Sequence, residues 1–234
     1  GLQVVLLEAR ELGWGASGRN GGQAIHGLAC DQDVIEGQLG LDDARRVWDM
    51  SIEALDLLRE RIATQGIACD WRDGYLGLAT TARKGAALAA WADRIERVYG
   101  YPLTRVPPAE LPRWIASPRF HSGMYDPRSG HLHPLKYTLG LARAAAAAGV
   151  RLHEHSPVTA LVQGATPTLR TERGSVQARQ GRVSILRYKR QPRVFATILR
   201  RDRLHHSVIV EGQQPCCFVH AVQQPCCGQP GAGA

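Results

Sequence analysis

The sequence predicts an α/β fold, and three features of its first 180 residues indicate this class. Residues 1–10, Gly-Leu-Gln-Val-Val-Leu-Leu-Glu-Ala-Arg, form an apolar run that ends in polar residues. Such a run is typical of a strand buried on both faces of a parallel sheet. Residues 41–65 and 83–99 carry apolar side chains at helical spacing. A third helix is predicted over residues 134–148, followed by a strand pair or a bent strand over residues 150–162.

Turn-forming residues predict how these elements are connected. Residues 69–80 indicate a short β-hairpin built around Asp73 and Gly74. Residues 107–118 form a proline-rich connection, and residues 119–133 indicate a turn-rich segment. The alternation of strands, helices and loops therefore fits an α/β chain that carries an inserted segment of mixed character.

Two compositional regimes divide the chain. Residues 1–180 hold 21 basic and 19 acidic residues, whereas residues 181–234 hold 8 basic and 2 acidic residues, so the formal net charge of +8 belongs mainly to the C-terminal part. The run Gln-Gln-Pro-Cys-Cys occurs twice, at residues 213–217 and 223–227. Residues 181–234 are therefore predicted to form an aberrant low-complexity tail. An alternative is a nucleic-acid or acidic-surface binder, but the basic residues there have little aromatic interleaving and match no nucleic-acid motif.

The hydropathy pattern bears on localisation. No apolar run approaches the roughly 20 residues that a transmembrane helix needs. Residues 1–10 lack the basic start and the cleavage site of a signal peptide. We therefore expect a cytoplasmic protein that engages neither a membrane nor a nucleic acid.

An acid and a glycine-rich loop form the candidate cofactor site. In a dinucleotide-binding fold, an acid at the end of the second strand accepts hydrogen bonds from the adenosine ribose, and Glu8 has that position, although a surface cap is the alternative for a lone acid. Residues 13–22 contain five glycines together with Ser17, Arg19 and Asn20. Successive unhindered amides can form an anion-binding nest, Ser17 can donate to a phosphate oxygen, and Arg19 supplies positive charge.

Residues 14–23, Trp-Gly-Ala-Ser-Gly-Arg-Asn-Gly-Gly-Gln, resemble the second FAD motif of the D-amino-acid oxidase superfamily, closest to its γ-glutamylputrescine oxidase branch. The resemblance implies a partial dinucleotide-binding (Rossmann-like) FAD domain with an inserted α+β substrate-domain segment. It also implies non-covalent FAD, with Glu8 on the ribose and a loop along the pyrophosphate and the flavin ring. The implied loop residues are Ala16, Ser17, Gly18, Arg19, Asn20, Gly21, Gly22 and Gln23.

Residues 129–135, Ser-Gly-His-Leu-His-Pro-Leu, resemble the family's return from the substrate domain to the flavin domain. The strand that follows the next helix would then run past the adenine, with backbone groups of Val158 as the contact. His131 and His133, together with His121, could instead suggest a zinc site. Because no Cys or acid completes a ligand set at the usual spacing, we expect no metal.

The resemblance also implies limits for the domains. Residues 1–69 would form a partial FAD-binding domain without its first strand, and residues 70–128 would form part of the substrate domain. Residues 129–180 would return to the FAD-binding domain, ahead of the tail at 181–234. The glycine fingerprint expected about 20 residues before the ribose-binding acid is not in the chain, so we expect a fragment.

The implied activity is the FAD-dependent oxidation of an amine or amino acid. The C–N bond is oxidised to an imine, the imine hydrolyses, and oxygen reoxidises the flavin. No catalytic side chain is assigned, because hydride transfer does not require a general base and the cofactor carries the chemistry. The alternative is an inactive remnant of such an enzyme, truncated or altered by a frameshift near residue 180.

Overall fold

The computed structural model describes residues 3–164, 166–178, 182–185 and 194–197, the last two segments as backbone only. The chain divides into two compact units. Of the described residues, unit 1 comprises residues 3–20, 60–70 and those from 133 onward, and unit 2 comprises residues 21–59 and 71–132. The domain limits that we expected at residues 69 and 128 stay predictions. Residues 21–59, which we expected within the FAD-binding domain, cluster with unit 2.

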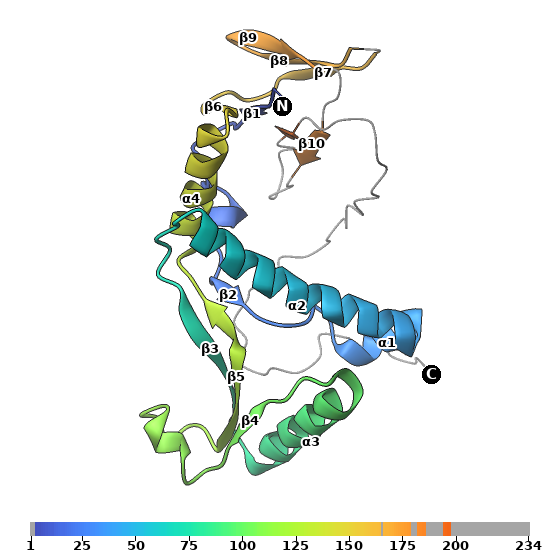
Figure 1. Cartoon of the computed structure of the whole chain (residues 1–234), viewed down its shortest axis with the longest axis vertical. Coiled ribbons are helices and arrows are strands. Elements are labelled where there is room, and N and C mark those ends of the chain that lie inside the picture. The colour runs from blue at the N-terminus through green and yellow to red at the C-terminus, as the bar shows by residue number, and fades with distance from the viewer. Residues whose placement is uncertain (1–2, 165, 179–181, 186–193, 198–234) are drawn as a thin grey trace, which may run out of the picture. The chain divides into compact units, whose positions relative to one another are not determined.

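Unit 1 is built on a sheet with the strand order β10-β11-β1-β6. Strand β1 (Val5–Leu7) pairs in parallel with β6 (Arg151–His153), in the register Val5 opposite Arg151. The strand predicted near the start of the sequence is therefore confirmed, and β6 runs parallel to it (Figure 1). The expected burial on both faces is met only in part, because Val5 and Leu7 are buried and Leu6 is half-buried. On its other edge β1 pairs antiparallel with β11 (Val194–Thr197), which pairs with β10 (Arg182–Ile185). Apart from these two strands, the tail predicted over residues 181–234 lies outside the described residues.

A three-stranded antiparallel meander covers part of the β1 surface. It comprises β7 (Ala160–Val162), β8 (Thr168–Thr171) and β9 (Gly174–Gln177), in the order β7-β8-β9. Its buried Leu169 packs with Val5 and Leu7 of β1, and this cluster is the apolar core of the unit. Residues 150–162 thus hold two strands that lie in different sheets and do not pair with each other.

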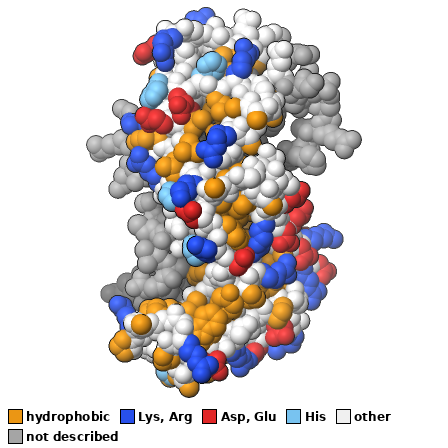
Figure 2. Space-filling model, turned by 60° about the vertical axis from the view of Figure 1, so that its left-hand side comes forward, with side chains coloured by type: hydrophobic (Ala, Val, Ile, Leu, Met, Phe, Trp, Pro, Cys, Tyr) orange, Lys and Arg blue, Asp and Glu red, His pale blue; other side chains and the backbone are white. Residues whose placement is uncertain are grey.

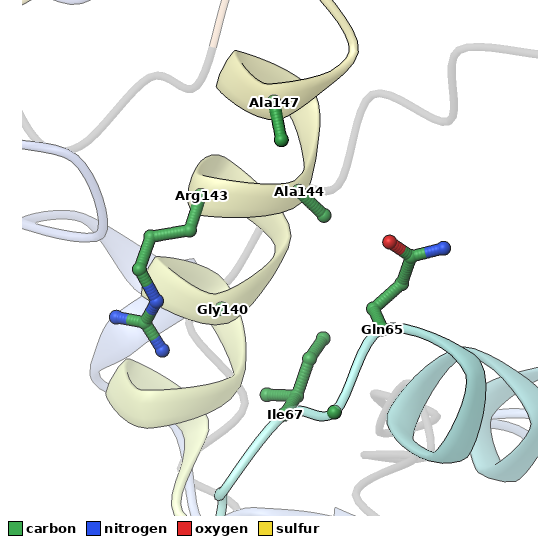
Figure 3. Close-up of a pocket in the computed structure, with 7 residues that line it drawn as sticks. Gln65, Ile67, Gly140, Arg143, Ala144 and Ala147 are labelled. Carbon is green, nitrogen blue, oxygen red and sulfur yellow. The ribbon is translucent and has the colours of Figure 1, made fainter.

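Helix α4 (Pro134–Ala147) confirms the predicted alanine-rich helix. Proline at its first position and Gly149, with φ of 88°, set its two ends. The helix packs closely on the segment after α2, because a Cβ added to Gly140 would lie 2.3 Å from Cγ2 of Ile67. A small cavity of about 250 Å³ opens beside this contact, with Gln65 on one wall and α4 on the other (Figure 3).

Unit 2 contains an antiparallel sheet around β5 (Ser122–His131). Strand β3 (Arg72–Ala79) pairs with β5 along its length, whereas β2 (Gln23–Ala24) and β4 (Thr104–Val106) pair with its two ends. This arrangement is α+β, as expected for the inserted segment. Figure 1 shows β3 and β5 side by side.

Two of our predictions for this sheet are wrong. Asp73 and Gly74 do not form a hairpin turn, because residues 72–79 form one strand with a register shift between Asp73 and Tyr75. Gly74 has φ of 97°, so its left-handed backbone belongs to a bulge and not to a turn. Residues 122–131, which we expected to be turn-rich, form the longest strand that the structure describes.

Three helices accompany this sheet: α1 (Gln32–Leu39), α2 (Leu41–Thr64) and α3 (Ala82–Tyr99). The last two confirm the predicted helices, and α1 was not predicted. Thr81 caps α3 by accepting a hydrogen bond from the amide of Lys84, and Gly100 ends the helix with φ of 63°. Trp48, Ile95 and Tyr101 form the buried core of the unit.

The proline-rich connection that we predicted over residues 107–118 contains one short element. This is the 3-10 helix η2 (Leu111–Arg113). No helix in the described residues is long and apolar enough to cross a membrane. On the face drawn in Figure 2, acidic and basic side chains are interspersed.

Candidate cofactor site

Glu8 lies immediately after the carboxyl end of β1 and is held by three hydrogen bonds. Its amide donates to the His153 carbonyl (2.8 Å), and its carbonyl accepts from the Ser156 amide (2.8 Å). Its carboxylate Oε1 accepts from the Arg10 amide (2.9 Å). The acid is therefore fixed at the strand end where open parallel sheets bind ligands.

The glycine-rich loop folds as a compact turn around the 3-10 helix η1 (Ala16–Gly18). Within it, the amide of Gly18 donates to the Gly15 carbonyl (3.3 Å) and the amide of Arg19 donates to the Ala16 carbonyl (3.2 Å). A Cβ added to Gly18 would lie 2.1 Å from the carbonyl oxygen of Gly13, which itself has φ of 79°. Glycine is thus required at both positions by the turn alone.

Helix α4 supports this loop from a distant part of the sequence. Oγ1 of Thr138 donates to the Ser17 carbonyl (3.0 Å), and the Leu135 side chain lies 2.9 Å from the position of a Cβ on Gly18. The Asn20 amide group donates to the Ala16 and Ser17 carbonyls, at 2.9 and 3.2 Å. The loop is therefore anchored by its carbonyls and glycines, while the side chains of Ala16 and Ser17 stay exposed.

The end of the loop belongs to unit 2. Gly22 has φ of 72°, and its carbonyl accepts a hydrogen bond from the Leu132 amide (2.9 Å). Gln23 opens β2 opposite His131 of β5, and the end of its side chain lies against Gly21. The expected binding residues therefore fall in two groups, Glu8 to Asn20 in unit 1 and Gly21 to Gln23 in unit 2.

Val158 lies in the connection between β6 and β7, two residues after Ser156. Its side chain packs on the core formed by Val5, Leu7 and Leu169. A cavity of about 740 Å³ lies in the same unit, lined by residues of β1, β6, residues 154 and 156 and the β8–β9 hairpin. The hydrogen bond from the Ser156 amide to the Glu8 carbonyl therefore joins Glu8 to the segment that leads to Val158.

A buried polar cluster in unit 2 was not predicted from the sequence. At its centre is Asp126, of which 2% is exposed. Its carboxylate accepts hydrogen bonds from His26 Nδ1 (2.7 Å), from the Tyr101 hydroxyl (3.0 Å to each oxygen), from the Ser129 hydroxyl and from the Arg128 amide (2.9 Å). The cluster ties the segment after the glycine loop to β5.

The electrostatics of this cluster favour an ionised carboxylate. Burial alone would raise the pKa of Asp126, but the hydrogen bonds from His26, Ser129 and the Arg128 amide outweigh it and lower the pKa to about 2. Burial, together with the adjacent Asp126 charge, raises the pKa of Tyr101, which therefore stays a hydroxyl donor. The His26 ring also lies among the rings of Trp48, Trp91 and Tyr101, with centroid distances of 5.0 to 5.9 Å.

The histidines considered for zinc have other surroundings. The His133 ring accepts from the Lys136 amide and caps α4, and His131 lies in β5. Within the part of the chain that the structure describes, no group of three or more His, Cys, Asp or Glu residues is placed to hold a metal ion.

Comparison with known proteins identifies the fold. Residues 1–185 match the family model described as FAD dependent oxidoreductase. The chain is 40% identical over 164 residues to the probable oxidoreductase OrdL of Haemophilus influenzae, covering 70% of this chain and 38% of that protein. It is 37% identical over 179 residues to the γ-glutamylputrescine oxidoreductase of Escherichia coli, covering 76% of this chain and 42% of that protein. The chain therefore spans about two-fifths of the length of these relatives.

Solved structures show the same fold at lower identity. Glycine oxidase from Geobacillus kaustophilus is similar with a TM-score of 0.58 and 23% identity, over 75% of this chain and 46% of that one. L-amino acid deaminase from Proteus myxofaciens, solved with anthranilate, is similar with a TM-score of 0.60 and 18% identity, over 77% of this chain and 39% of that one.

Proposed function

The chain belongs to the family of FAD-dependent oxidoreductases, and on that basis we propose that it supplies the adenosine and pyrophosphate half of an FAD site in an enzyme that oxidises amines or amino acids. The observation that carries this proposal is the fixed carboxylate of Glu8 at the end of the parallel strand β1, on the same chain segment as the packed glycine loop.

The geometry of unit 1 fits a dinucleotide. Glu8 Oε1 is oriented by the Arg10 amide, so the carboxylate is preset to accept hydrogen bonds from ribose hydroxyls. A Cβ built on Gly15 has no heavy atom within 4 Å, which leaves room for a phosphate to approach the backbone. Because the amides of Gly18 and Arg19 donate inside the turn, those of Ala16 and Ser17 would bind the phosphate oxygens.

The remaining contacts follow from the chain's own geometry. The side chain of Val158 is held by the core, which leaves its main-chain groups for the adenine. The guanidinium of Arg19 would offset phosphate charge, and residues 20–23 would continue along the flavin ring. Gly21 and Gly22 carry no side chain, so the ring could approach the backbone if the end of the Gln23 side chain, which lies against Gly21, moves aside.

The substrate side of the reaction would be provided by residues 71–128 of unit 2. The bound cofactor would supply the acceptor for a hydride from the carbon next to the substrate nitrogen, and molecular oxygen would be the final acceptor. The chain's part would be to position that carbon and to keep the amine neutral by excluding water. Because one relative is a γ-glutamylputrescine oxidoreductase, a γ-glutamylated diamine is the first substrate to test, followed by amino acids.

The test is a visible absorption spectrum of the purified chain after incubation with FAD and desalting. We expect the chain to retain a flavin band, and Glu8→Gln to raise the dissociation constant about tenfold, as the loss of a charge-assisted hydrogen bond implies. Glu53→Gln, an exposed acid on α2, is the matched control and should bind FAD like the unmodified chain.

A colourless chain would overturn the cofactor site and favour an inactive remnant of the family. If Glu8→Gln retains FAD as well as the unmodified chain does, the cofactor stays in place but the role of this carboxylate is contradicted. Turnover of the γ-glutamylated diamine with release of peroxide would then test the proposed substrate and acceptor.

A further inference from the structure

Two arginine side chains, one before the glycine loop and one within it, share one indole ring. The guanidinium carbon of Arg10 lies 3.8 Å from the ring centroid of Trp14, and that of Arg19 lies 4.6 Å from the same centroid. The two carbons are therefore at most about 8 Å apart, the sum of these distances. Both arginines are exposed, and Trp14 is half-buried.

Three acids of the same unit have contacts other than with the two guanidinium groups. The carboxylate of Glu8 accepts from the Arg10 amide (2.9 Å), and that of Glu154 accepts from the Leu12 amide (2.7 Å). The carboxylate of Glu11 lies 3.8 Å from the ring of His155. Within the described residues, neither Arg10 nor Arg19 forms an ion pair with a carboxylate. The fold thus brings two guanidinium groups onto one indole ring, while the carboxylates of Glu8 and Glu154 accept from backbone amides.

Such a pair repels itself unless an anion joins it. Two guanidinium charges at this separation repel each other, and the face of an indole ring offsets only part of this repulsion. A ligand with two adjacent negative charges would turn the repulsion into attraction. Planar guanidinium groups are also well suited to paired phosphate oxygens.

We propose that Arg10, Trp14 and Arg19 form the diphosphate clamp of the dinucleotide site, with Trp14 as the positioning residue that holds both guanidinium groups. This inference rests on the proposed function and adds to it a second cation and the indole that orients the two. The backbone of the clamp is already fixed, because the Arg10 carbonyl accepts from the His155 amide (3.0 Å) and the Arg19 amide donates into η1 (3.2 Å). Only the side chains need to adjust to the ligand.

The experiment measures binding of inorganic pyrophosphate and of FAD to the full chain by calorimetry, at low and moderate salt. Trp14→Leu removes both ring contacts and should raise both dissociation constants about tenfold, since each cation–π contact contributes roughly two- to fivefold. Trp14→Phe keeps a ring face and should recover most of that loss. Arg10→Gln should raise both constants about tenfold while leaving the indole in place.

The matched control is Trp114→Leu, which removes a tryptophan that contacts the ring of Tyr125 in unit 2. It should leave both constants unchanged. Riboflavin, which carries no phosphate, should bind each variant as weakly as it binds the unmodified chain. Higher salt should weaken pyrophosphate binding to the unmodified chain more than to Arg10→Gln, because the variant has lost one of the two charges.

The outcomes separate this inference from the proposed function. A chain that binds pyrophosphate at the clamp but not FAD supports the inference and overturns the proposed cofactor site. A chain that binds FAD equally well in Trp14→Leu, Arg10→Gln and unmodified form keeps the proposed function and refutes the clamp. Absence of binding to either ligand refutes both.

Discussion

Replacing Asp126 by Asn should destabilise unit 2 more than any exposed Asp→Asn change. The carboxylate accepts hydrogen bonds from four groups, among them the His26 ring and the hydroxyls of Tyr101 and Ser129. An amide presents one acceptor oxygen and one NH₂ group. At least one of the buried donors would therefore face another donor, in a site where 2% of Asp126 and none of Ser129 is exposed.

The magnitude follows from two independent routes. Breaking a buried, charge-assisted pair by changing one partner costs about 3 kcal/mol of unfolding free energy. The pKa of Asp126, lowered from 3.8 to about 2, corresponds to about 2 kcal/mol of preference for the ionised form at 1.36 kcal/mol per unit. We therefore expect Asp126→Asn to lose about 2 to 3 kcal/mol.

The assay is urea unfolding followed by tryptophan fluorescence. Four of the five tryptophans belong to unit 2, and two of them, Trp48 and Trp91, lie against the His26 ring. Asp43→Asn is the matched control, because Asp43 lies on the surface of α2 and pairs with the exposed Arg46. It should change stability by less than about 0.5 kcal/mol. Equal effects of the two substitutions would refute the account of the buried cluster.

The same carboxylate predicts how stability depends on pH. The folded-state pKa of Asp126 is lower than that of a free aspartate, so the unfolded chain binds the proton more readily. The contribution of Asp126 is therefore complete above about pH 4 and is lost as the pH falls through about 2. In Asp126→Asn, the fall of stability between these values should be smaller by about 2 kcal/mol. An identical acid profile for the variant and the unmodified chain would contradict the lowered pKa.

Two further predictions concern local packing. Gly140→Ala should destabilise unit 1 by about 1 to 2 kcal/mol despite the better helix propensity of alanine, because the new methyl group would lie 2.3 Å from Ile67. Gly37→Ala in α1, where a Cβ meets open space, should instead stabilise the chain by about 0.5 to 1 kcal/mol. Stability changes of the same sign for both variants in thermal unfolding would contradict this reasoning. Thr81→Ala should cost about 1 kcal/mol in urea unfolding by removing the cap of α3, and Thr81→Ser should retain it; equal loss in the two variants would exclude the cap.

The elements that the sequence predicted well are those whose pattern is local. Helices α2, α3 and α4 show apolar spacing and glycine or proline at their ends, and each forms as expected. Strand β1 shows an unbroken apolar run, of which Val5 and Leu7 are buried and Leu6 is half-buried. In each case the residues that define the element are its own residues, so no distant contact is needed to recognise it.

The hairpin predicted where β3 forms one strand, and the turns predicted where β5 forms, were wrong because the glycines of these strands serve packing. A Cβ on Gly130 would lie 2.5 Å from the Trp71 ring, and one on Gly74 would lie 2.4 Å from the Tyr125 hydroxyl. These glycines let large aromatic side chains lie flat against the strands. The sequence contains glycine, proline and serine in these segments but does not reveal which aromatic rings pack on them. A turn and a closely packed strand therefore have the same sequence pattern.

The candidate site was predictable in its first part for a similar reason. Glu8 and the glycine loop are close in sequence, and their pattern could be read directly. The Asp126 cluster could not, because His26 and Asp126 are 100 residues apart and neither has an unusual neighbour. The one weak signal was Asp126 itself. Its burial could have been predicted only if residues 122–131 had first been recognised as a strand.

The loop's support by α4 explains why the glycine motif does not fix its own shape. Gly13 and Gly18 allow the turn to close, but the carbonyl of Ser17 is held by Thr138 and the packing of Gly18 by Leu135, about 120 residues later. Phosphate-binding amides need a rigid backbone, because a mobile one would lose entropy on binding. The glycines therefore allow the backbone to adopt this turn, and the contacts with α4 hold it there. A substitution at Leu135 or Thr138 should therefore loosen the loop backbone as much as a substitution within the loop.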